Sequence, residues 1–510
     1  MRLALRSLAV AVLFAVLAGS QSPPRKTYRI TGVVVNRATG QVMPHTRILM
    51  HAAGKSSSEF ETSSDGTGKF VFERVWEGMW SLYAEHEGFV RQGFGARPGV
   101  PDSFTQVVTG PNGASEDLTF PLDAPAAVSG KIVDEDGEPV PAALEIMIEL
   151  ETGIHRFERI RNAMTDERGE FRIGDLPAVK CYLLAVAAPP QVDDPSEAPE
   201  TLSPTYYSNT PDARAATVLD LKPGEEYRAD FTMRRAHGVS VKVDGEIGSS
   251  VGMLSAEGPG GAGVILNQFE AGQGRTFYNL SPGRYQVTLF DPRTNEQSAR
   301  TVEVKNEDIT LHAPFEGPTV NANVRLVDAD PSLLTTVNLW LHADGEYQTH
   351  ARTVGADGKV TLSGMTGGRY KFLLATAGLY IKSFRADVPN TDRMVDLPGK
   401  GAVKLDVVLA GDGGEVSGYV RSKGKPVAPA RVVLAPRNDS TNSADYSSYQ
   451  TESDGSFRYQ SVKPGDYVVF ATTDFKLEFG NPAAIGKHLS GGMAVHVEPK
   501  STVKVEIEPL

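Results

Sequence analysis

The sequence has 510 residues, with 51 Gly, 33 Pro, a single Cys and a formal net charge of −12 at pH 7. This length exceeds one hydrophobic core, and the Gly and Pro content without long helical periodicity favours several all-β domains. The negative charge argues against nucleic acid or an anionic membrane as a partner, and one cysteine excludes an intramolecular disulfide framework.

The first twenty residues have the three parts of a Sec-type signal peptide. Arg2 and Arg6 form a basic start, residues 7–18 are uncharged, and small residues at 18–20 provide a cleavage site. Residues 1–20 therefore predict a secreted or periplasmic product, with an uncleaved anchor as the alternative. Ser20 stands where a lipobox has its lipidated cysteine, and no later stretch reaches the ~18 apolar residues of a membrane span. We predict no membrane span in the mature chain.

A block of two strands and a turn recurs through the chain. It covers residues 30–44, 128–141 and 416–427, with Gly or Pro where a hairpin requires them. Versions that keep the period-2 alternation but lack the glycine turn begin at 238 and 320. Each block predicts the start of a new domain.

A second repeated block follows the first and is most complete at residues 451–470. Asp454-Gly455 predicts a tight turn between two strands, and Pro464-Gly465 predicts a second turn. The copies align on Gly68, Gly169, Gly358 and Gly455, and the step from Gly169 to Gly358 is about twice the others. That step therefore spans two units.

Two further strands close each copy, which gives the strand density of a β-sandwich. We predict an all-β fold, a tandem array of about five Ig-like or transthyretin-like antiparallel β-sandwich domains. Units 3 and 4 are degenerate copies, and residues 188–204 in unit 2 are interpreted as an acidic, Pro-rich loop. The predicted domains are residues 28–125, 126–236, 237–316, 317–411 and 412–510.

The two blocks together resemble the carboxypeptidase regulatory-like domain family, a transthyretin-like, carbohydrate-binding-like fold found as tandem copies in secreted bacterial proteins. The resemblance lies in units 1, 2 and 5, on residues 64–82, 165–183 and 451–470 with the blocks before them. It implies the fold, an extracytoplasmic location and a carbohydrate-binding or adhesive role. Its motifs are turn and core residues, so it implies no catalytic residue.

Several short patterns match catalytic or metal motifs without their context. His155 and Glu158 have the spacing of a zinc pair, but they would lie on opposite faces of a strand and no third ligand follows nearby. Residues 248–252 fit a nucleophile elbow and 258–263 a dinucleotide loop, but neither opens a helix. The acidic turns at 134–137 and 328–330 favour solvated turns over calcium sites. We predict no enzyme activity, no metal and no cofactor.

The repeat alignment predicts which unusual side chains are buried. Cys181 and Trp80 align with Tyr467 and are expected in the core, whereas Trp76 aligns with Lys463 in a polar turn and is expected at the surface. An exposed Trp contacts a neighbouring domain or offers a stacking face to a ligand.

Trp340 is the second candidate for a stacking face. Leu339 and Leu341 alternate with Asn338, Trp340 and His342, so the latter three are predicted to share the face opposite to the core. A Trp between two hydrogen-bonding side chains suits a sugar, although packing against a loop or another unit is the competing interpretation.

These features predict a non-enzymatic, extracytoplasmic binding protein. One hypothesis is carbohydrate binding through Trp340, Asn338, His342 and Trp76, with a polysaccharide as partner. The alternative is a structural spacer or a protein-interaction and adhesion scaffold, with an envelope protein as partner, for which we expect an elongated particle.

Overall fold

The computed structural model describes residues 26–54, 60–97, 100, 103–151, 155–187, 200–257, 263–269, 275–293, 296–343, 349–375, 378–391, 393–437 and 445–510. Within these ranges the chain is almost entirely β, as predicted, and the strands form five pairs of sheets and one further two-stranded sheet. We number the corresponding units 1 to 5 in chain order. The predicted signal peptide at residues 1–20 and most of the loop predicted at 188–204 lie outside the described residues.

Unit 1 shows the arrangement that the other units repeat. Its strands are β1 (Thr27–Asn36), β2 (Arg47–Ala52), β3 (Phe60–Ser63), β4 (Lys69–Trp76), β5 (Gly78–Glu85), β6 (Gln92–Gly93), β7 (Val107–Thr109) and β8 (Leu118–Leu122). The first sheet has the order β4-β1-β8, and the second has the order β3-β2-β5-β6, with β7 also paired to β5. Ile30, Leu82 and Phe120 meet between the sheets in one buried core.

Unit 2 keeps these two sheets and adds strands. It contains β9 (Ala126–Val133), β10 (Ala142–Glu151), β11 (His155–Met164), β12 (Glu170–Leu176), β13 (Lys180–Ala187), β14 (Glu200–Leu202), β15 (Thr205–Tyr206), η1 (Ala213–Ala215), β16 (Leu219–Asp220), β17 (Glu226–Arg228) and β18 (Phe231–Thr232). The end of the predicted loop differs from expectation, because β14 pairs with β19 (Arg235–His237) at the start of unit 3. That pairing satisfies backbone groups that a loop would leave to solvent.

Units 3 and 4 are complete sandwiches although their sequences are degenerate copies. Unit 3 contains β20 (Val239–Gly245), β21 (Val251–Glu257), β22 (Gly263–Phe269), β23 (Thr276–Leu280), β24 (Gly283–Asp291), β25 (Glu296–Val304) and β26 (Ile309–Ala313). Unit 4 contains β27 (Pro318–Val327), η3 (Pro331–Thr336), β28 (Asn338–Ala343), β29 (Thr349–Thr353), β30 (Lys359–Leu362), β31 (Gly368–Ala375), β32 (Tyr380–Ala386), β33 (Asn390–Thr391), β34 (Met394–Leu397) and β35 (Gly401–Ala410). Each unit buries its own apolar cluster.

Unit 5 adds the α-helix α2 to the sandwich. Its elements are β36 (Gly414–Ser422), β37 (Lys425–Pro426), β38 (Arg431–Pro436), β39 (Ser447–Gln450), β40 (Ser456–Val462), β41 (Gly465–Thr472), α2 (Pro482–Leu489), β42 (Met493–Val497) and β43 (Thr502–Ile507). Helix α2 was not predicted, although Asn481 followed by Pro482 is a helix-start signal and the Asn481 side chain caps the helix. Ile485 of α2 covers Val433 and Phe470 on the outer face of the second sheet.

In every unit the first strand pairs in parallel with a closing strand, which the sequence did not reveal. The parallel pairs are β1 with β8, β9 with β17 and β18, β20 with β26, β27 with β35, and β36 with β43. A parallel pair needs a long crossover in place of a hairpin, and here strands of the second sheet lie within that crossover. The pairing therefore closes each sandwich on itself.

The turn glycine of the repeat is fixed against the first strand. Gly68, Gly169, Gly358 and Gly455 all have φ between 72° and 80°, in the left-handed region. A Cβ on any of them would lie within about 3.0 Å of a first-strand carbonyl oxygen, which belongs to Val420 in unit 5. The glycine carbonyl accepts the N–H of the same first-strand residue, as in Val420 N to Gly455 O at 2.8 Å. The positive φ and the close approach to the first strand therefore both require glycine at this position.

A second repeated position confirms the alignment of the copies. Trp80, Cys181, Tyr285, Tyr370 and Tyr467 each pair with an aliphatic residue of the next strand of the second sheet. The three tyrosines donate their hydroxyl to the carbonyl four residues earlier, at 2.7 to 3.1 Å, and Trp80 Nε1 does the same at 3.2 Å. Cys181 occupies the position in unit 2 and is fully buried, as predicted.

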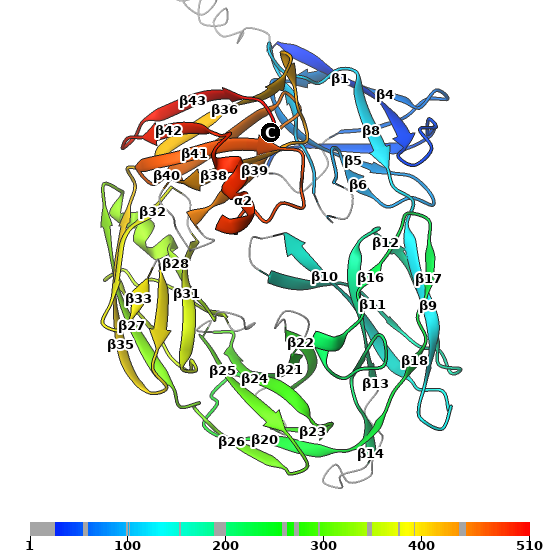
Figure 1. Cartoon of the computed structure of the whole chain (residues 1–510), viewed down its shortest axis with the longest axis vertical. Coiled ribbons are helices and arrows are strands. Elements are labelled where there is room, and N and C mark those ends of the chain that lie inside the picture. Colours follow the sequence, from blue (N-terminus) through cyan, green and yellow to red (C-terminus); the bar gives the residue numbers. More distant parts are fainter. Residues whose placement is uncertain are drawn as a thin grey trace, which may run out of the picture.

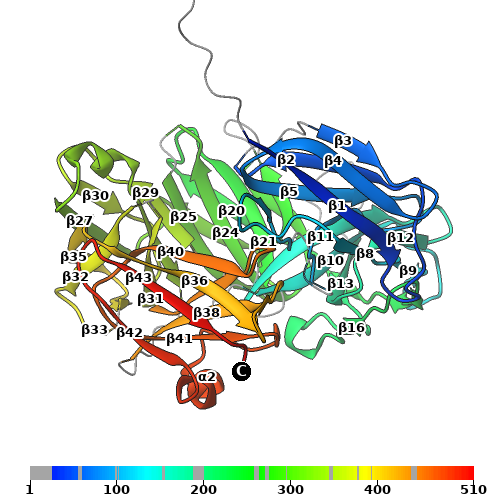
Figure 2. The same ribbon diagram turned by 90° about the horizontal axis from the view of Figure 1, so that it is seen from above.

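The five units follow one another around a closed ring, and unit 5 returns to lie against unit 1 (Figures 1 and 2). The first sheets lie on the outside, as β27 and β35 show in unit 4, and the second sheets lie toward the middle, as β28 and β31 show (Figure 1). Hydrogen bonds join residues 450–453 of unit 5 to residues 95–114 of unit 1. The expectation of an elongated particle is therefore wrong, because polar contacts between the first and last units close the array.

Small-angle scattering tests the closed ring. We expect a radius of gyration near that of a compact chain of this size, about 23 Å, because the two ends of the array are in contact. A linear array of the same units would give a much larger value and a scattering profile typical of a rod. A rod-like profile of the purified chain would contradict the ring.

Candidate binding interface

Trp340 lies on β28 as the sequence predicts. Leu339 and Leu341 are fully buried in the core of unit 4, whereas Trp340 is 38% exposed on the opposite face with Asn338 and His342. The strand pairs with β29 and β31, which place the backbone of Leu373 opposite Trp340. The predicted grouping of the three side chains is confirmed.

The surroundings of Trp340 are polar and partly enclosed. The Asn338 side-chain oxygen accepts a hydrogen bond from the Thr353 hydroxyl at 2.7 Å. Lys371, which pairs with His342 across the sheet, is only 8% exposed. A ligand on this face would therefore meet one indole ring and a rim of hydrogen-bonding groups.

Trp76 is also exposed, as its alignment with Lys463 predicts. It is 47% exposed at the end of β4, next to Phe60 in an edge-to-face contact with 6.5 Å between ring centroids. Met79 at the start of β5 is 42% exposed. Trp80, by contrast, is buried in the core.

Trp76 and Trp340 lie in different units, with β4 and β28 on opposite sides of the ring (Figure 1). The structure does not bring the two tryptophans into one site.

A polar contact between units 5 and 1 was not predicted from the sequence, and we call it the latch. It consists of residues 450–454 of unit 5 and residues 95–97 and 104–114 of unit 1. Ser453 donates its N–H to the Gln106 carbonyl at 2.9 Å, and its hydroxyl accepts the Val108 N–H at 2.9 Å and donates to the Ala114 carbonyl at 2.6 Å. Glu452 accepts the Gln106 N–H at 2.9 Å.

A side-chain amide and an aromatic ring extend the latch. Gln450 Nε2 donates to the Phe104 carbonyl at 3.0 Å and to the Thr105 hydroxyl at 2.9 Å. The guanidinium groups of Arg97 in unit 1 and Arg431 in unit 5 lie 4.7 and 5.5 Å from the centroid of the Phe475 ring. Two cations from different units thus share one ring.

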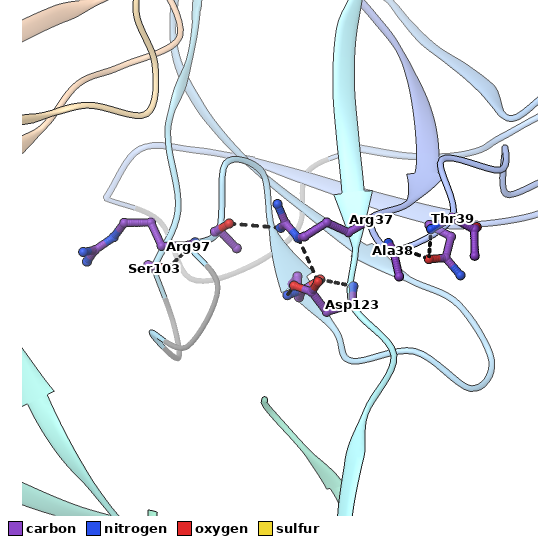
Figure 3. Close-up of polar contacts among 9 residues, drawn as sticks. Arg37, Ala38, Thr39, Arg97, Ser103 and Asp123 are labelled. Atoms are coloured by element: carbon purple, nitrogen blue, oxygen red, sulfur yellow. Dashed lines mark hydrogen bonds and ion pairs between the residues drawn. The ribbon is translucent and has the colours of Figure 1, made fainter. Parts of the chain in front are cut away.

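Asp123 supports the part of unit 1 that receives the latch (Figure 3). Its carboxylate accepts from Arg37 Nε at 2.8 Å and from the Gln92 amide at 2.7 Å, and Arg37 also donates to the Ala96 carbonyl at 3.2 Å. Asp123 follows the last strand of unit 1 directly. The same residue therefore fixes both the connection to unit 2 and the segment that contacts unit 5.

Glu452 is a buried carboxylate with neutral hydrogen-bond donors. It is 6% exposed, accepts the Tyr449 hydroxyl at 2.6 Å, and faces the 104–114 segment, which contains no charged side chain. Burial raises the pKa of Glu452, and Asp454 in the same turn adds to that effect, although the donors from Tyr449 and Gln106 oppose it. The contacts of Glu452 in the latch are thus hydrogen bonds from neutral donors.

The sequence signal that reveals the latch is a substitution at the repeat turn. In units 1 and 2 the corresponding residues are Asp65 and Asp166, whose carboxylates accept N–H groups of their own turns. Unit 5 has Glu452 there, and its carboxylate reaches across to Gln106. The longer side chain in place of Asp was visible in the sequence.

The contact between units 3 and 4 also buries a titratable group. His350 on β29 is 1% exposed, and its Nδ1 lies 3.1 Å from the Gln297 carbonyl of unit 3. Burial lowers the pKa of His350 to about 4, and the Gln297 carbonyl opposes that effect. The histidine is therefore neutral at pH 7.

Cys181, Asp134 and Asp330, which the sequence singled out as possible reactive or metal-binding residues, have structural roles. Burial raises the pKa of the Cys181 thiol to about 12, so it is not a nucleophile at neutral pH. Asp134 accepts N–H groups of its own turn and pairs with Arg235, and Asp330 caps η3. The backbone of His155 and Glu158 lies on β11, but their side chains are outside the description.

Among the described residues, no group of three or more His, Cys, Asp or Glu side chains is arranged to hold a metal ion. The same part of the chain contains no helix with the length and apolar character that crossing a membrane requires. Of the segment 248–252, residues 248–250 form a turn, whereas Val251 and Gly252 begin the strand β21, so no helix follows the turn. A shallow polar groove lies where unit 4 meets unit 5, lined by Glu415, Gln460, Ser461, Lys500 and Thr502 among others.

Comparison with known proteins matches one unit of the chain. Residues 412–484 match the family described as BOS complex subunit NOMO1-like, second beta sandwich domain. The human BOS complex subunits NOMO3 and NOMO1 are each 37% identical over 83 residues, which is 16% of this chain and 6% of each human protein. This agrees with a transthyretin-like sandwich in unit 5. The match covers one unit of this chain and a small fraction of each human protein, so it bears on the fold of unit 5 alone.

Several solved structures align with this chain, but at low sequence identity and low TM-scores. The Bacillus anthracis TIE protein aligns with 79% of this chain and 78% of its own, at 10% identity and a TM-score of 0.18. The two B repeat units of the Staphylococcus aureus collagen binding protein align with 76% of this chain and 100% of their own, at 12% identity and a TM-score of 0.13. The Streptococcus agalactiae minor pilin GBS52 aligns with 41% of this chain and 97% of its own, at 12% identity and a TM-score of 0.23. Nothing about function follows from scores this low.

Ser453→Ala tests the latch. The substitution removes the acceptor of the Val108 N–H and the donor to the Ala114 carbonyl, which should weaken the contact by about 1–3 kcal/mol. We expect faster hydrogen exchange at the Gln106 and Val108 amides. The matched control is Glu167→Ala, which changes the corresponding exposed turn residue of unit 2. Equal exchange at Val108 in wild type and Ser453→Ala would contradict the latch.

Because His350 is buried and neutral, we expect the free energy of unfolding to decrease in acid. Because its pKa is about 4 in the folded chain and about 6.5 when exposed, the penalty is absent above pH 6.5 and grows to roughly 3 kcal/mol at pH 4. His350→Gln should therefore lose less stability between pH 7 and pH 4 than wild type does, in denaturant titrations followed by Trp fluorescence. His237→Gln, at an exposed histidine, should behave like wild type. Identical pH dependence in all three proteins would refute a buried neutral His350.

Proposed function

We propose that this chain is a non-catalytic binding scaffold in which a closed ring holds five β-sandwiches in fixed relative positions. The latch is the observation that carries the proposal, because it joins the two end units that a simple spacer would leave apart. A ring restrains the units, so surfaces on different units can engage one partner without the entropy cost of ordering an extended array.

The proposed location is extracytoplasmic. The support is the signal-peptide pattern at residues 1–20 and the resemblance of units 1, 2 and 5 to carboxypeptidase regulatory-like domains. An envelope protein or polysaccharide is the proposed partner. Neither activity nor cofactor is proposed, because the chemistry of Cys181, Asp134 and Glu452 is accounted for by burial, turn capping and the latch.

Carbohydrate binding is the second candidate function. It is favoured by the exposed indole rings of Trp340 and Trp76, which offer flat apolar faces to sugar rings. Trp340 is the stronger candidate because Asn338 and His342 flank it with hydrogen-bonding groups on one face of a rigid sheet. A sugar there would face the middle of the ring, where the second sheets lie (Figure 1).

Retention on immobilised polysaccharides separates the two candidates. If a sugar stacks on Trp340, Trp340→Ala should lower the affinity about tenfold, a loss of about 1.4 kcal/mol, while far-UV circular dichroism is unchanged. Trp76→Ala tests the other surface in the same assay. Tyr278→Ala, at an aromatic residue of unit 3 that is 39% exposed, is the control. If no polysaccharide in a broad panel retains the wild type, the scaffold alone remains and carbohydrate binding is rejected.

A further inference from the structure

The unit 5 turn fills the free edge of β7 as a neighbouring strand would. Val107 and Thr109 pair with β5 on one side, so the backbone groups of Gln106 and Val108 point away from that sheet. Two N–H groups and one carbonyl on this edge receive complementary groups from Glu452 and Ser453. An unpaired edge of this kind is a template for pairing with another chain.

The turn that fills this edge is specialised for it. The corresponding Asp65 and Asp166 use their carboxylates within their own turns. In unit 5 that role passes to Asp454, which accepts the Ser456 N–H at 3.0 Å, and Glu452 and Ser453 are left to reach the edge of β7. The complementarity therefore lies in one short turn and one short edge.

The contact joins two different surfaces that are remote in sequence. Ser453 and Val108 are 345 positions apart, and the only covalent path between them runs through units 2, 3 and 4. The same groups would meet in the same geometry if the turn came from a second molecule. Which contact forms depends on the effective concentration that this path provides, compared with the concentration of other copies.

We propose that the latch exchanges between two copies of this chain, so that the unit 5 turn of each copy docks on β7 of the other. A contact between unlike surfaces that closes within one molecule can close equally in a two-chain ring that contains the contact twice. Each chain carries a net charge of −12, which opposes the encounter, but the docking segment 104–114 is uncharged. Exchange therefore increases with protein concentration and with salt, which screens the repulsion. The partner that the surface fits is a second copy, independently of any ligand of the scaffold.

Site-specific cross-linking of mixed chains tests the exchange. One preparation carries Gln106→Cys and the other Ser448→Cys, at an exposed residue of β39 two positions before Gln450, so that Glu452 and Ser453 keep their hydrogen bonds. A short bismaleimide can link these two thiols between chains only when unit 5 of one copy lies on unit 1 of the other. The native Cys181 is fully buried and does not react in the folded chain. After opening in mild denaturant and return to native buffer at high protein concentration, we expect a cross-linked heterodimer at about tenfold the control level. The control replaces Ser448→Cys by Asn162→Cys, at the corresponding exposed residue of unit 2.

Two further measurements make the outcome decisive. A single chain with both Gln106→Cys and Ser448→Cys should cross-link internally, which shows that the thiols are within reach. Glu452→Ala added to the Ser448→Cys chain should reduce the heterodimer, because it removes the acceptor of the Gln106 N–H. Internal cross-linking with no heterodimer above the control would overturn the exchange. Failure of the internal cross-link would overturn the latch and the exchange together. Neither readout depends on polysaccharide binding, so failure of the carbohydrate hypothesis is seen separately.

Discussion

The structure depends on one tight turn that is held against the first strand of its own unit. A glycine with positive φ lets the chain reverse so closely that its carbonyl accepts the N–H of the first strand, as Gly455 does with Val420. In units 1, 2 and 5 the residue four positions before the glycine is Ser64, Thr165 or Thr451. Its hydroxyl bridges two backbone groups where the first strand of the second sheet begins, at β2, β10 or β38. The turn is thus hydrogen-bonded to both sheets of its sandwich.

The same turn also determines how the units assemble. In units 1 and 2 its acidic residue accepts N–H groups of the turn itself, and the turn is largely exposed. In unit 5 the exchange of Asp for Glu moves the carboxylate outward, and the freed backbone and hydroxyl of Ser453 meet the edge of β7. One methylene group at a repeated position therefore distinguishes a carboxylate that caps its own turn from one that contacts another unit.

Local patterns in the sequence were sufficient for the architecture within each unit. The positions of Gly68, Gly169, Gly358 and Gly455, the alternation around Trp340, and the burial of Cys181 all follow from short-range periodicity and from aligning the copies. The parallel pairing of first and closing strands was not predictable, because period-2 alternation does not report strand direction. The closure of the ring was not predictable either, because it depends on polar groups about 345 positions apart that leave no periodic trace.

The candidate surfaces differ in what the fold requires of them. The aromatic residues at the position of Tyr467 are needed where they are, because their polar atoms reach the carbonyl four residues earlier and their rings fill the core. Trp340 and Trp76 satisfy no such requirement, since a polar side chain at either place would leave the core intact. The latch residues are intermediate, because they are buried like core residues but contact another unit. Each unit has its own buried apolar cluster, yet two buried residues of unit 5, Glu452 and Ser453, direct hydrogen-bonding groups to unit 1. A buried carboxylate costs free energy unless its hydrogen bonds are made, so the position of Glu452 favours the closed ring over an open array.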